Sequence, residues 1–113
     1  MSVYVILESG TTSIKIGFTD LPVAKRLKEL QTGNPSELQI LAEQRDGGRD
    51  LEKYLHEKFK DCHIIREWFK LEKDSELVKY INDISDYYID IDEVNDKVLI
   101  YNKMKNWHVD LEG

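Results

Sequence analysis

Two hydrophobic segments lie close together at the start of the chain, separated by a turn. Residues 3–7 form a continuous apolar run rich in β-branched and aromatic side chains, which is typical of a buried strand. Residues 9–12 have turn chemistry, and residues 14–18 alternate between apolar and polar positions. The pattern predicts a β-hairpin, in which Gly17 permits a bulge or the close approach of another backbone or a ligand.

A helix is expected after this hairpin. Thr19 or Asp20 can cap its start, Pro22 suits its first turn, and Gly33 with the following Asn-Pro ends it. Apolar residues at helical spacing give it one buried stripe, formed by Val23, Leu27 and Leu30.

A third strand and a second helix follow. Residues 38–44 alternate as a strand does, and two glycines end the run. Asp50 is expected to cap a helix that extends to about residue 60. Its inward side chains are expected to be Leu51, Leu55 and Phe59. Residues 64–69 are expected to form a loop or a short extended piece.

The remaining pattern predicts one more helix and a second hairpin. Asp74 or Ser75 can cap the helix, and the hairpin consists of residues 88–92 and 98–101 around the turn Asn95-Asp96. The core-facing residues of this helix are expected to be Leu77, Val78, Ile81 and Ile84. The order of the elements predicts an α+β fold.

Length and composition limit the class of protein. A chain of 113 residues with 41% hydrophobic residues is enough for one domain with a modest core. No apolar stretch approaches the ~20 residues that a membrane span needs, and the N-terminus lacks a signal-type run. The single cysteine, Cys62, excludes an internal disulfide and a Cys-rich zinc site, so we expect a cytoplasmic protein without a membrane partner.

The net charge of −6 is unevenly distributed. Residues 1–70 contain 11 basic and 11 acidic residues, whereas residues 71–113 contain 5 basic and 11 acidic residues. All four arginines lie in the first part, and Arg suits bidentate contacts with phosphate. We therefore expect the first part to be able to bind an anion. The acidic part would repel one, or would bind a basic protein partner.

Four residues stand out chemically: Tyr4, Lys15, Arg26 and Glu52. Phenol, cation and carboxylate together can support phosphoryl chemistry, with the carboxylate holding a metal and the phenol handling a proton. Taken singly, each also has an ordinary structural explanation. Tyr4 suits a half-buried strand, Arg26 a solvated helix face, and Glu52 with His56 a surface pair at i,i+4.

The spacing of short motifs makes the functional interpretation more specific. In order, these motifs are Val3-Tyr4-Val5-Ile6, Ile14-Lys15-Ile16-Gly17-Phe18-Thr19, Arg26-Leu27, Leu30-Gln31-Thr32-Gly33-Asn34-Pro35, Glu52, Leu55-His56, Phe59 and Glu67-Trp68-Phe69. The ordered set resembles the GIY-YIG nuclease superfamily, in particular its compact phage and fungal branch. The resemblance covers residues 3 to about 71.

The resemblance implies a three-stranded antiparallel sheet flanked by helices. It also implies a nuclease core in residues 1–71. The resemblance does not cover residues 72–113, which the hydrophobic pattern and the charge predict to be an acidic helix-plus-hairpin extension packed on the core. The implied activity is that of an endonuclease that hydrolyses nucleic-acid phosphodiester bonds, with DNA as the expected substrate and Mg²⁺ or Mn²⁺ as cofactor.

The resemblance also assigns roles to single residues. It makes Tyr4 a general base or proton shuttle, and Gly17 the residue that keeps the floor of the site open. It further makes Arg26 the residue that steadies charge on the scissile phosphate, and Glu52 the metal ligand.

Two departures from the family pattern concern the path of the proton. Lys15 replaces a tyrosine, and could hold the phosphate or lower the pKa of Tyr4. A late asparagine of other branches has no counterpart, and Glu67-Trp68-Phe69 stands in its region. His56, four residues after Glu52, could contact the nucleophile or the phosphate.

Two other functions remain open on the sequence alone. One is a binding module of the same fold that has lost catalysis, and the other is an inhibitor or decoy whose acidic C-terminal segment imitates nucleic acid. The acidic net charge favours both, because DNA-binding domains are usually basic.

Overall fold

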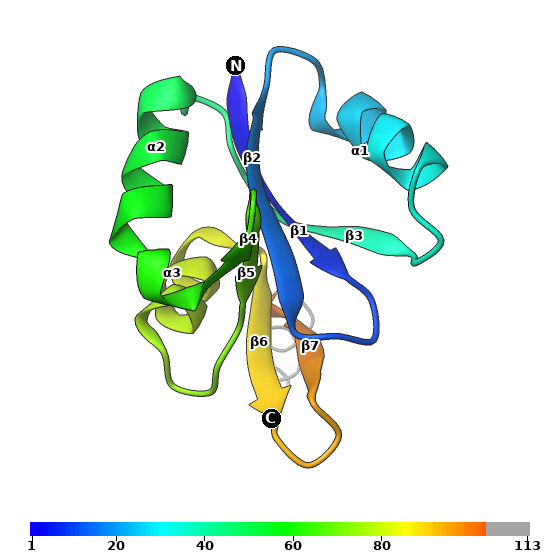
Figure 1. Ribbon diagram of the computed structural model, residues 1–113, viewed down its shortest axis with the longest axis vertical. Helices are drawn as coiled ribbons and strands as arrows, with labels where there is room; N and C mark the ends of the chain where they lie inside the picture. Colours follow the sequence, from blue (N-terminus) through cyan, green and yellow to red (C-terminus); the bar gives the residue numbers. More distant parts are fainter. Residues whose placement is uncertain (104–113) are drawn as a thin grey trace, which may run out of the picture.

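The computed structural model describes residues 1–103 and has an α+β architecture (Figure 1). Five strands form one antiparallel sheet in the order β3-β1-β2-β5-β4. Their bounds are Ser2–Glu8 (β1), Ser13–Thr19 (β2), Leu38–Gln44 (β3), His63–Ile65 (β4) and Trp68–Lys70 (β5). The expected three-stranded sheet is present as β3-β1-β2. The expected loop at residues 64–69 is instead a short hairpin that adds two strands beside β2.

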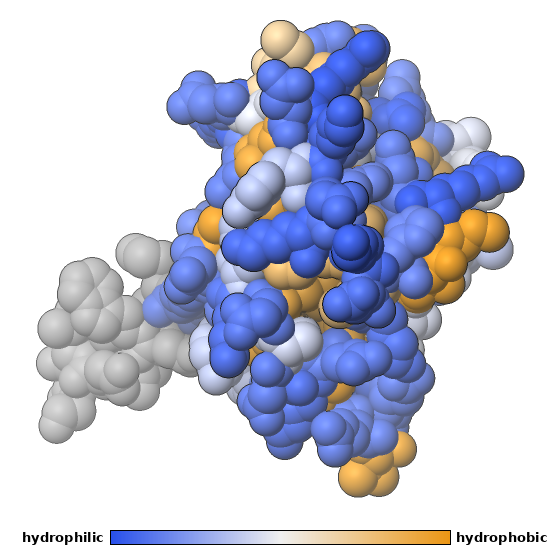
Figure 2. Space-filling view, turned by 60° about the vertical axis from the view of Figure 1, so that its left-hand side comes forward, coloured by the Kyte–Doolittle hydropathy of each residue, from blue (hydrophilic) through white to orange (hydrophobic). Residues whose placement is uncertain are grey.

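Three helices flank the sheet, with α1 on one side and α2 and α3 on the other (Figure 1). Their bounds are Val23–Thr32 (α1), Arg49–Lys58 (α2) and Glu76–Ile84 (α3), and a 3-10 turn at Lys60–Cys62 follows α2. The predicted second hairpin is confirmed as β6 (Tyr87–Asp92) and β7 (Lys97–Asn102). The side of α2 has a largely hydrophilic surface with small hydrophobic patches (Figure 2).

Alternation along β1 divides the buried residues between the two faces of the sheet. Val3, Val5 and Leu7 belong to the large core, which also takes in residues of α2, α3 and β6. Tyr4 and Ile6 point the other way and form a small cluster with Val23 of α1 and Leu38 of β3. The period of two in a strand is therefore what separates Tyr4 from the main core.

The helix ends differ in part from the sequence prediction. Ser75 caps α3 as expected, since its hydroxyl accepts a hydrogen bond from the backbone N–H of Val78. α2 begins at Arg49 with Gly48 as its N-cap, so Asp50 lies inside the first turn and the prediction of an Asp50 cap was wrong. An acidic side chain there still stabilises the N-terminus through the helix dipole.

The C-terminal end of α1 is fastened by one side chain. The Gln31 amide donates to the carbonyl oxygens of Asn34 and Ser36, at 3.1 and 2.6 Å, and its oxygen accepts from the N–H of Leu38 at 2.9 Å. These bonds join α1, the following turn and the start of β3. At its other end α1 has no side-chain cap.

The C-terminal elements share the main core with the sheet. Leu77 and Ile81 of α3 are fully buried there, Ile89 and Ile91 of β6 are buried as well, and Ile84 packs against them. This is the packing expected for the extension, of which residues 104–113 lie outside the described part. Within residues 1–103, no helix has the length and apolar character needed to cross a membrane.

Candidate functional site

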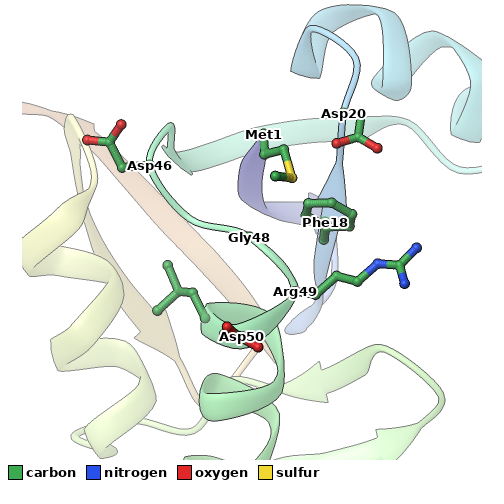
Figure 3. Close-up of a pocket in the computed structure, with 8 residues that line it drawn as sticks. Met1, Phe18, Asp20, Asp46, Gly48, Arg49 and Asp50 are labelled. Atoms are coloured by element: carbon green, nitrogen blue, oxygen red, sulfur yellow. The ribbon is translucent and has the colours of Figure 1, made fainter.

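The largest cavity lies at the start of α2, about 730 Å³ in volume (Figure 3). Its charged lining consists of three aspartates and one arginine, namely Asp20, Asp46, Asp50 and Arg49. None of the residues singled out by sequence lines it. Those residues gather instead around β2, between α1 and α2.

Tyr4 and Gly17 are directly opposite each other in the β1–β2 ladder. A Cβ atom at position 17 would lie 2.3 Å from the Tyr4 hydroxyl oxygen, so only glycine leaves room for the ring. Tyr4 is 1% exposed. The expected close approach at Gly17 is therefore that of the Tyr4 side chain. The β1–β2 register is unbroken, and the bulge of the sheet lies between Val5 and Ile6, where β1 pairs with β3.

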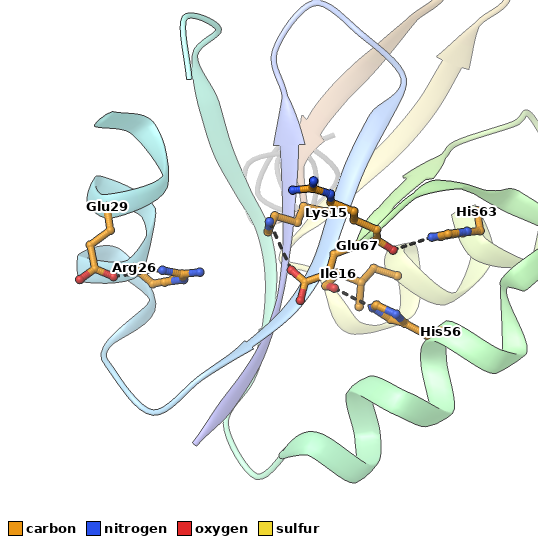
Figure 4. A network of polar contacts seen from close by, with 8 residues as sticks. Lys15, Ile16, Arg26, Glu29, His56, His63 and Glu67 are labelled. Carbon is orange, nitrogen blue, oxygen red and sulfur yellow. Dashed lines mark hydrogen bonds and ion pairs between the residues drawn. The ribbon is translucent and has the colours of Figure 1, made fainter. Parts of the chain in front are cut away.

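Arg26 projects from α1 towards the sheet and forms a side-chain hydrogen bond with Tyr4. Its guanidinium also donates to Glu29 one turn further along α1, at 3.3 Å (Figure 4). The hydrogen bond with Tyr4 is the main reason that the pKa of Arg26 is raised. Arg26 remains partly exposed, so its charge is available to an anion placed over the Tyr4 hydroxyl.

The pKa of Tyr4 is raised above its ordinary value, chiefly because the hydroxyl is buried. Arg26 acts in the opposite direction through its hydrogen bond and its charge, while the carboxylates of Glu67 and Glu52 add to the rise. The cation that lowers the pKa of Tyr4 is thus Arg26. Lys15 was a candidate for lowering the pKa of Tyr4, but its ammonium is paired with Glu67 instead.

Lys15 forms an ion pair with Glu67, with 3.2 Å between Nζ and Oε2 (Figure 4). Its ammonium also lies 5.7 Å from the ring centroid of Trp68, its neighbour in the β2–β5 ladder. The Lys15 side chain is only 16% exposed, so this pair is better shielded from water than most surface pairs.

Glu52 lies in the first turn of α2, a helix that packs on the opposite face of the sheet from the Tyr4 ring. Its charge nevertheless acts on the Tyr4 hydroxyl. The pKa of Glu52 is raised by burial and by the negative charge of Glu67, while His56, Arg49 and Lys15 lower it. Glu52 therefore belongs to the same electrostatic cluster as Tyr4, Lys15 and Glu67.

The edge of β2 explains how α2 reaches this cluster. The pairing of β5 with β2 ends at Lys15, and the last backbone bond runs from the Ile16 N–H to the Glu67 carbonyl. Next to it, the Ile16 carbonyl accepts a hydrogen bond from Nε2 of His56, at 2.8 Å. His56 therefore bonds α2 to β2 just beyond the point where the β2–β5 pairing ends. His56 lies one helical turn after Glu52, so this bond also holds Glu52 near β2.

His56 is a positioning residue in this structure. Because a carbonyl can only accept, Nε2 of His56 carries the proton in this bond. The ring also packs edge-on against Phe69, with 5.0 Å between centroids. The sequence left open a contact with the nucleophile or the phosphate, and the contacts that the structure gives are instead with the backbone of β2 and with the core.

Glu67 is the member of the cluster that sequence reasoning missed as a site residue. It stands in the turn between β4 and β5 and acts on Lys15, Tyr4 and Glu52 at once. In the sequence, the only sign of this role is that Glu67 directly precedes the aromatic pair Trp68-Phe69. The partners of Glu67 follow from the pairing of β5 with β2, which was not predicted from the sequence.

Other metal-ligand groups and the single cysteine give no second site in the described residues. Within residues 1–103, no three or more His, Cys, Asp and Glu side chains are grouped so as to hold a metal ion. Cys62 is partly buried against the main core, and burial raises the pKa of its thiol, so it packs as a small apolar residue. Phe69 is fully buried, as expected for a core residue.

The acidic hairpin lies away from the cluster. Its turn is at the opposite end of the molecule from the start of α2 (Figure 1). There Asp96 pairs with Lys70 of β5 at 3.6 Å, and Asp92 accepts hydrogen bonds from the backbone of Val94 and Asn95. These contacts hold Asp92 within the hairpin turn and Asp96 against β5.

The chain matches a known family of protein domains. The family model described as the T5orf172 domain matches residues 1–85, well over half of the chain. The match includes the whole cluster around β2, and it extends through α3, beyond residue 71. No curated protein and no solved structure matches the chain.

Proposed function

The chain belongs to the T5orf172 domain family, a phage-associated domain found in nuclease-like proteins, and we propose that it is a metal-dependent endonuclease of the GIY-YIG type. The proposed substrate is a phosphodiester bond of nucleic acid, with DNA preferred. One observation carries the proposal: a guanidinium from α1 and a carboxylate from α2 both act on the phenol of Tyr4, whose ring packs against Gly17.

The carboxylates of this cluster fit a Mg²⁺ or Mn²⁺ ion. The pKa of Glu52 is raised by burial and by the nearby charge of Glu67, so a cation held by Glu52 would favour its charged form. Mg²⁺ keeps several waters and is often held by one or two carboxylates, so it needs no larger set of ligands. When bound, such an ion supplies Lewis-acid activation of water and neutralises phosphate charge.

Tyr4 suits the role of a proton shuttle better than that of a phenolate base. Its pKa is raised, so the hydroxyl is protonated near neutral pH and can donate to an oxygen of the substrate. Arg26, bonded to the same hydroxyl, would hold the phosphate against it by charge-assisted hydrogen bonds.

Lys15 is proposed to bind the phosphate as a point charge after giving up Glu67. His56 would act through the backbone of β2, because its proton already serves the Ile16 carbonyl.

The test is a cleavage assay on single- and double-stranded DNA with Mg²⁺, with Mn²⁺ and with EDTA. Glu52→Gln keeps the shape of the side chain and removes the charge, so cleavage should fall by at least about 100-fold while the fold persists. Asp50→Asn is the matched control. Asp50 stands in the same helical turn as Glu52 but lines the cavity at the start of α2, outside the cluster.

Two outcomes would overturn parts of the proposal. Cleavage by Glu52→Gln at the wild-type rate would remove Glu52 from the metal site. Tight binding of DNA by the wild-type protein without cleavage under any metal condition would replace the enzyme with a binding module of the same fold.

A further inference from the structure

A second cavity, of about 560 Å³, lies beside the cluster, between α2 and the β4–β5 hairpin. Its lining consists of Lys53, His56, Glu57, Lys60, His63 and Arg66, and we call it the α2 groove. Three cations and one carboxylate stand in this lining. In the part of the chain that the structure describes, the other three main cavities each have more carboxylates than cations in their linings.

The charge of the α2 groove is unusual for this protein. With a net charge of −6, the chain as a whole repels a polyanion, so any binding of nucleic acid must use a local positive surface. The side of α2 is also hydrophilic over most of its surface (Figure 2). An open polar groove of positive charge suits backbone phosphates better than an apolar ligand.

The α2 groove borders the proposed catalytic cluster at the edge of β2. His56 lines the groove and bonds the Ile16 carbonyl, next to Lys15. Arg66 lines the groove and directly precedes Glu67, the partner of Lys15. A strand that lies over Lys15 and Arg26 therefore meets this groove where it leaves the site.

The backbone of Arg66 forms part of the tight turn between β4 and β5. Arg66 has a φ of 53°, a left-handed conformation that glycine or asparagine adopts at lower cost. Its carbonyl accepts a hydrogen bond from Nε2 of His63 across the hairpin turn. The hairpin turn thus carries a long, exposed cationic side chain at its tip.

We propose that the α2 groove binds the phosphates of the nucleic-acid strand next to the scissile bond, through Lys53, Lys60 and Arg66. This proposal rests on the proposed function, because it assigns the path of the same substrate. The contacts are with the backbone, so the groove adds affinity and orientation without base specificity.

The experiment compares two triple variants that remove the same charge. Lys53→Gln/Lys60→Gln/Arg66→Gln empties the groove of cations, and Lys73→Gln/Lys79→Gln/Lys97→Gln removes three cations from the C-terminal elements. Binding of a labelled DNA duplex and of its single strand is measured in EDTA across a salt titration, and thermal unfolding confirms that both variants fold.

The groove variant should bind duplex at least about tenfold more weakly at low salt, with the salt slope smaller by about 3. The control variant should stay close to wild type. Equal losses in the two variants, or none in the groove variant, would overturn the groove proposal and leave the nuclease proposal standing.

Two further outcomes separate the proposals. A selective loss of binding in the groove variant of a protein that cleaves no DNA would support the groove and overturn the nuclease. If the wild-type protein bound neither DNA probe, both proposals would fail.

Discussion

The two faces of the five-stranded sheet are built from alternate residues of the same strands, yet they differ in content. Within residues 1–103, the core on the face towards α2 and α3 includes sixteen buried apolar residues. The face towards α1 contains four, one of them Tyr4, whose hydroxyl meets a guanidinium. Trp68 and Phe69 show the contrast in two consecutive positions, since Phe69 is fully buried in the large core and Trp68 is half-buried beside Lys15.

This difference indicates a division of labour between the faces. Burial of apolar surface is the main favourable term in folding, so the large core provides most of the stability. The smaller face is then free to hold polar groups whose partners lie on separate elements. Variants on the two faces should therefore separate stability from activity.

The largest expected effect on stability is that of Phe69→Ala. Deleting a fully buried aromatic ring costs about 3–5 kcal/mol in the free energy of unfolding, through lost transfer energy and the cavity left behind. Trp68→Ala, its matched control on the other face, should cost less stability and weaken cleavage more, because Lys15 loses the ring beside it. Urea unfolding and a cleavage assay measure the two effects, and the reverse ranking would contradict the division of labour.

Gly17→Ala should have an intermediate effect on stability and a large one on the site. The new methyl group would lie 2.3 Å from the Tyr4 oxygen, so the ring must move, at a cost of about 1–3 kcal/mol. Cleavage should fall sharply, because the hydroxyl leaves Arg26.

A double variant sharpens this test. Adding Tyr4→Leu to Gly17→Ala removes the clashing ring, and part of the lost stability should return without any return of cleavage. Additive losses in urea unfolding would show that the ring and the glycine do not constrain each other.

The smallest expected effect is a pH dependence of the free energy of unfolding, caused by Glu52. Its pKa in the folded protein is raised above the ordinary 4.5, so between the two values the folded state binds more protons than the unfolded chain. Stability therefore falls as pH rises through this interval, and the cost persists at higher pH. Glu52→Gln should be the more stable protein above the interval, and the difference should vanish as pH falls below 4.5.

Paired unfolding curves of wild type and Glu52→Gln across pH measure this difference. Asp50→Asn serves as the control from the same helical turn. A difference that grew as the pH fell would contradict the direction of the Glu52 shift.

The sequence predicts the elements better than the contacts between them. Hydrophobic period and turn residues were enough for three helices, the β3-β1-β2 sheet and the second hairpin, because these are local signals. The β4–β5 hairpin was missed because its strands have three residues each and are stabilised by pairing with β2.

The same distinction applies to the site. Tyr4, Arg26 and Glu52 stand in recognisable motifs, so their sequence context singles them out. Glu67 becomes a member only when β5 is placed beside β2. The ion pair of Lys15 with Glu67 could not be predicted for the same reason. The hydrogen bond from His56 to Ile16 depends on where the β2–β5 pairing ends, which the sequence does not show.

The fastening of α1 by Gln31 has a consequence for motion. One end of the helix is tied by three hydrogen bonds to the turn and to β3, while the other end lacks a side-chain cap. Backbone opening of α1 is therefore expected first at the uncapped end, where the burial of Val23 holds the first turn. Arg26 lies in that part of the helix, so such an opening would carry its guanidinium away from Tyr4 while the anchor near Gln31 stays in place.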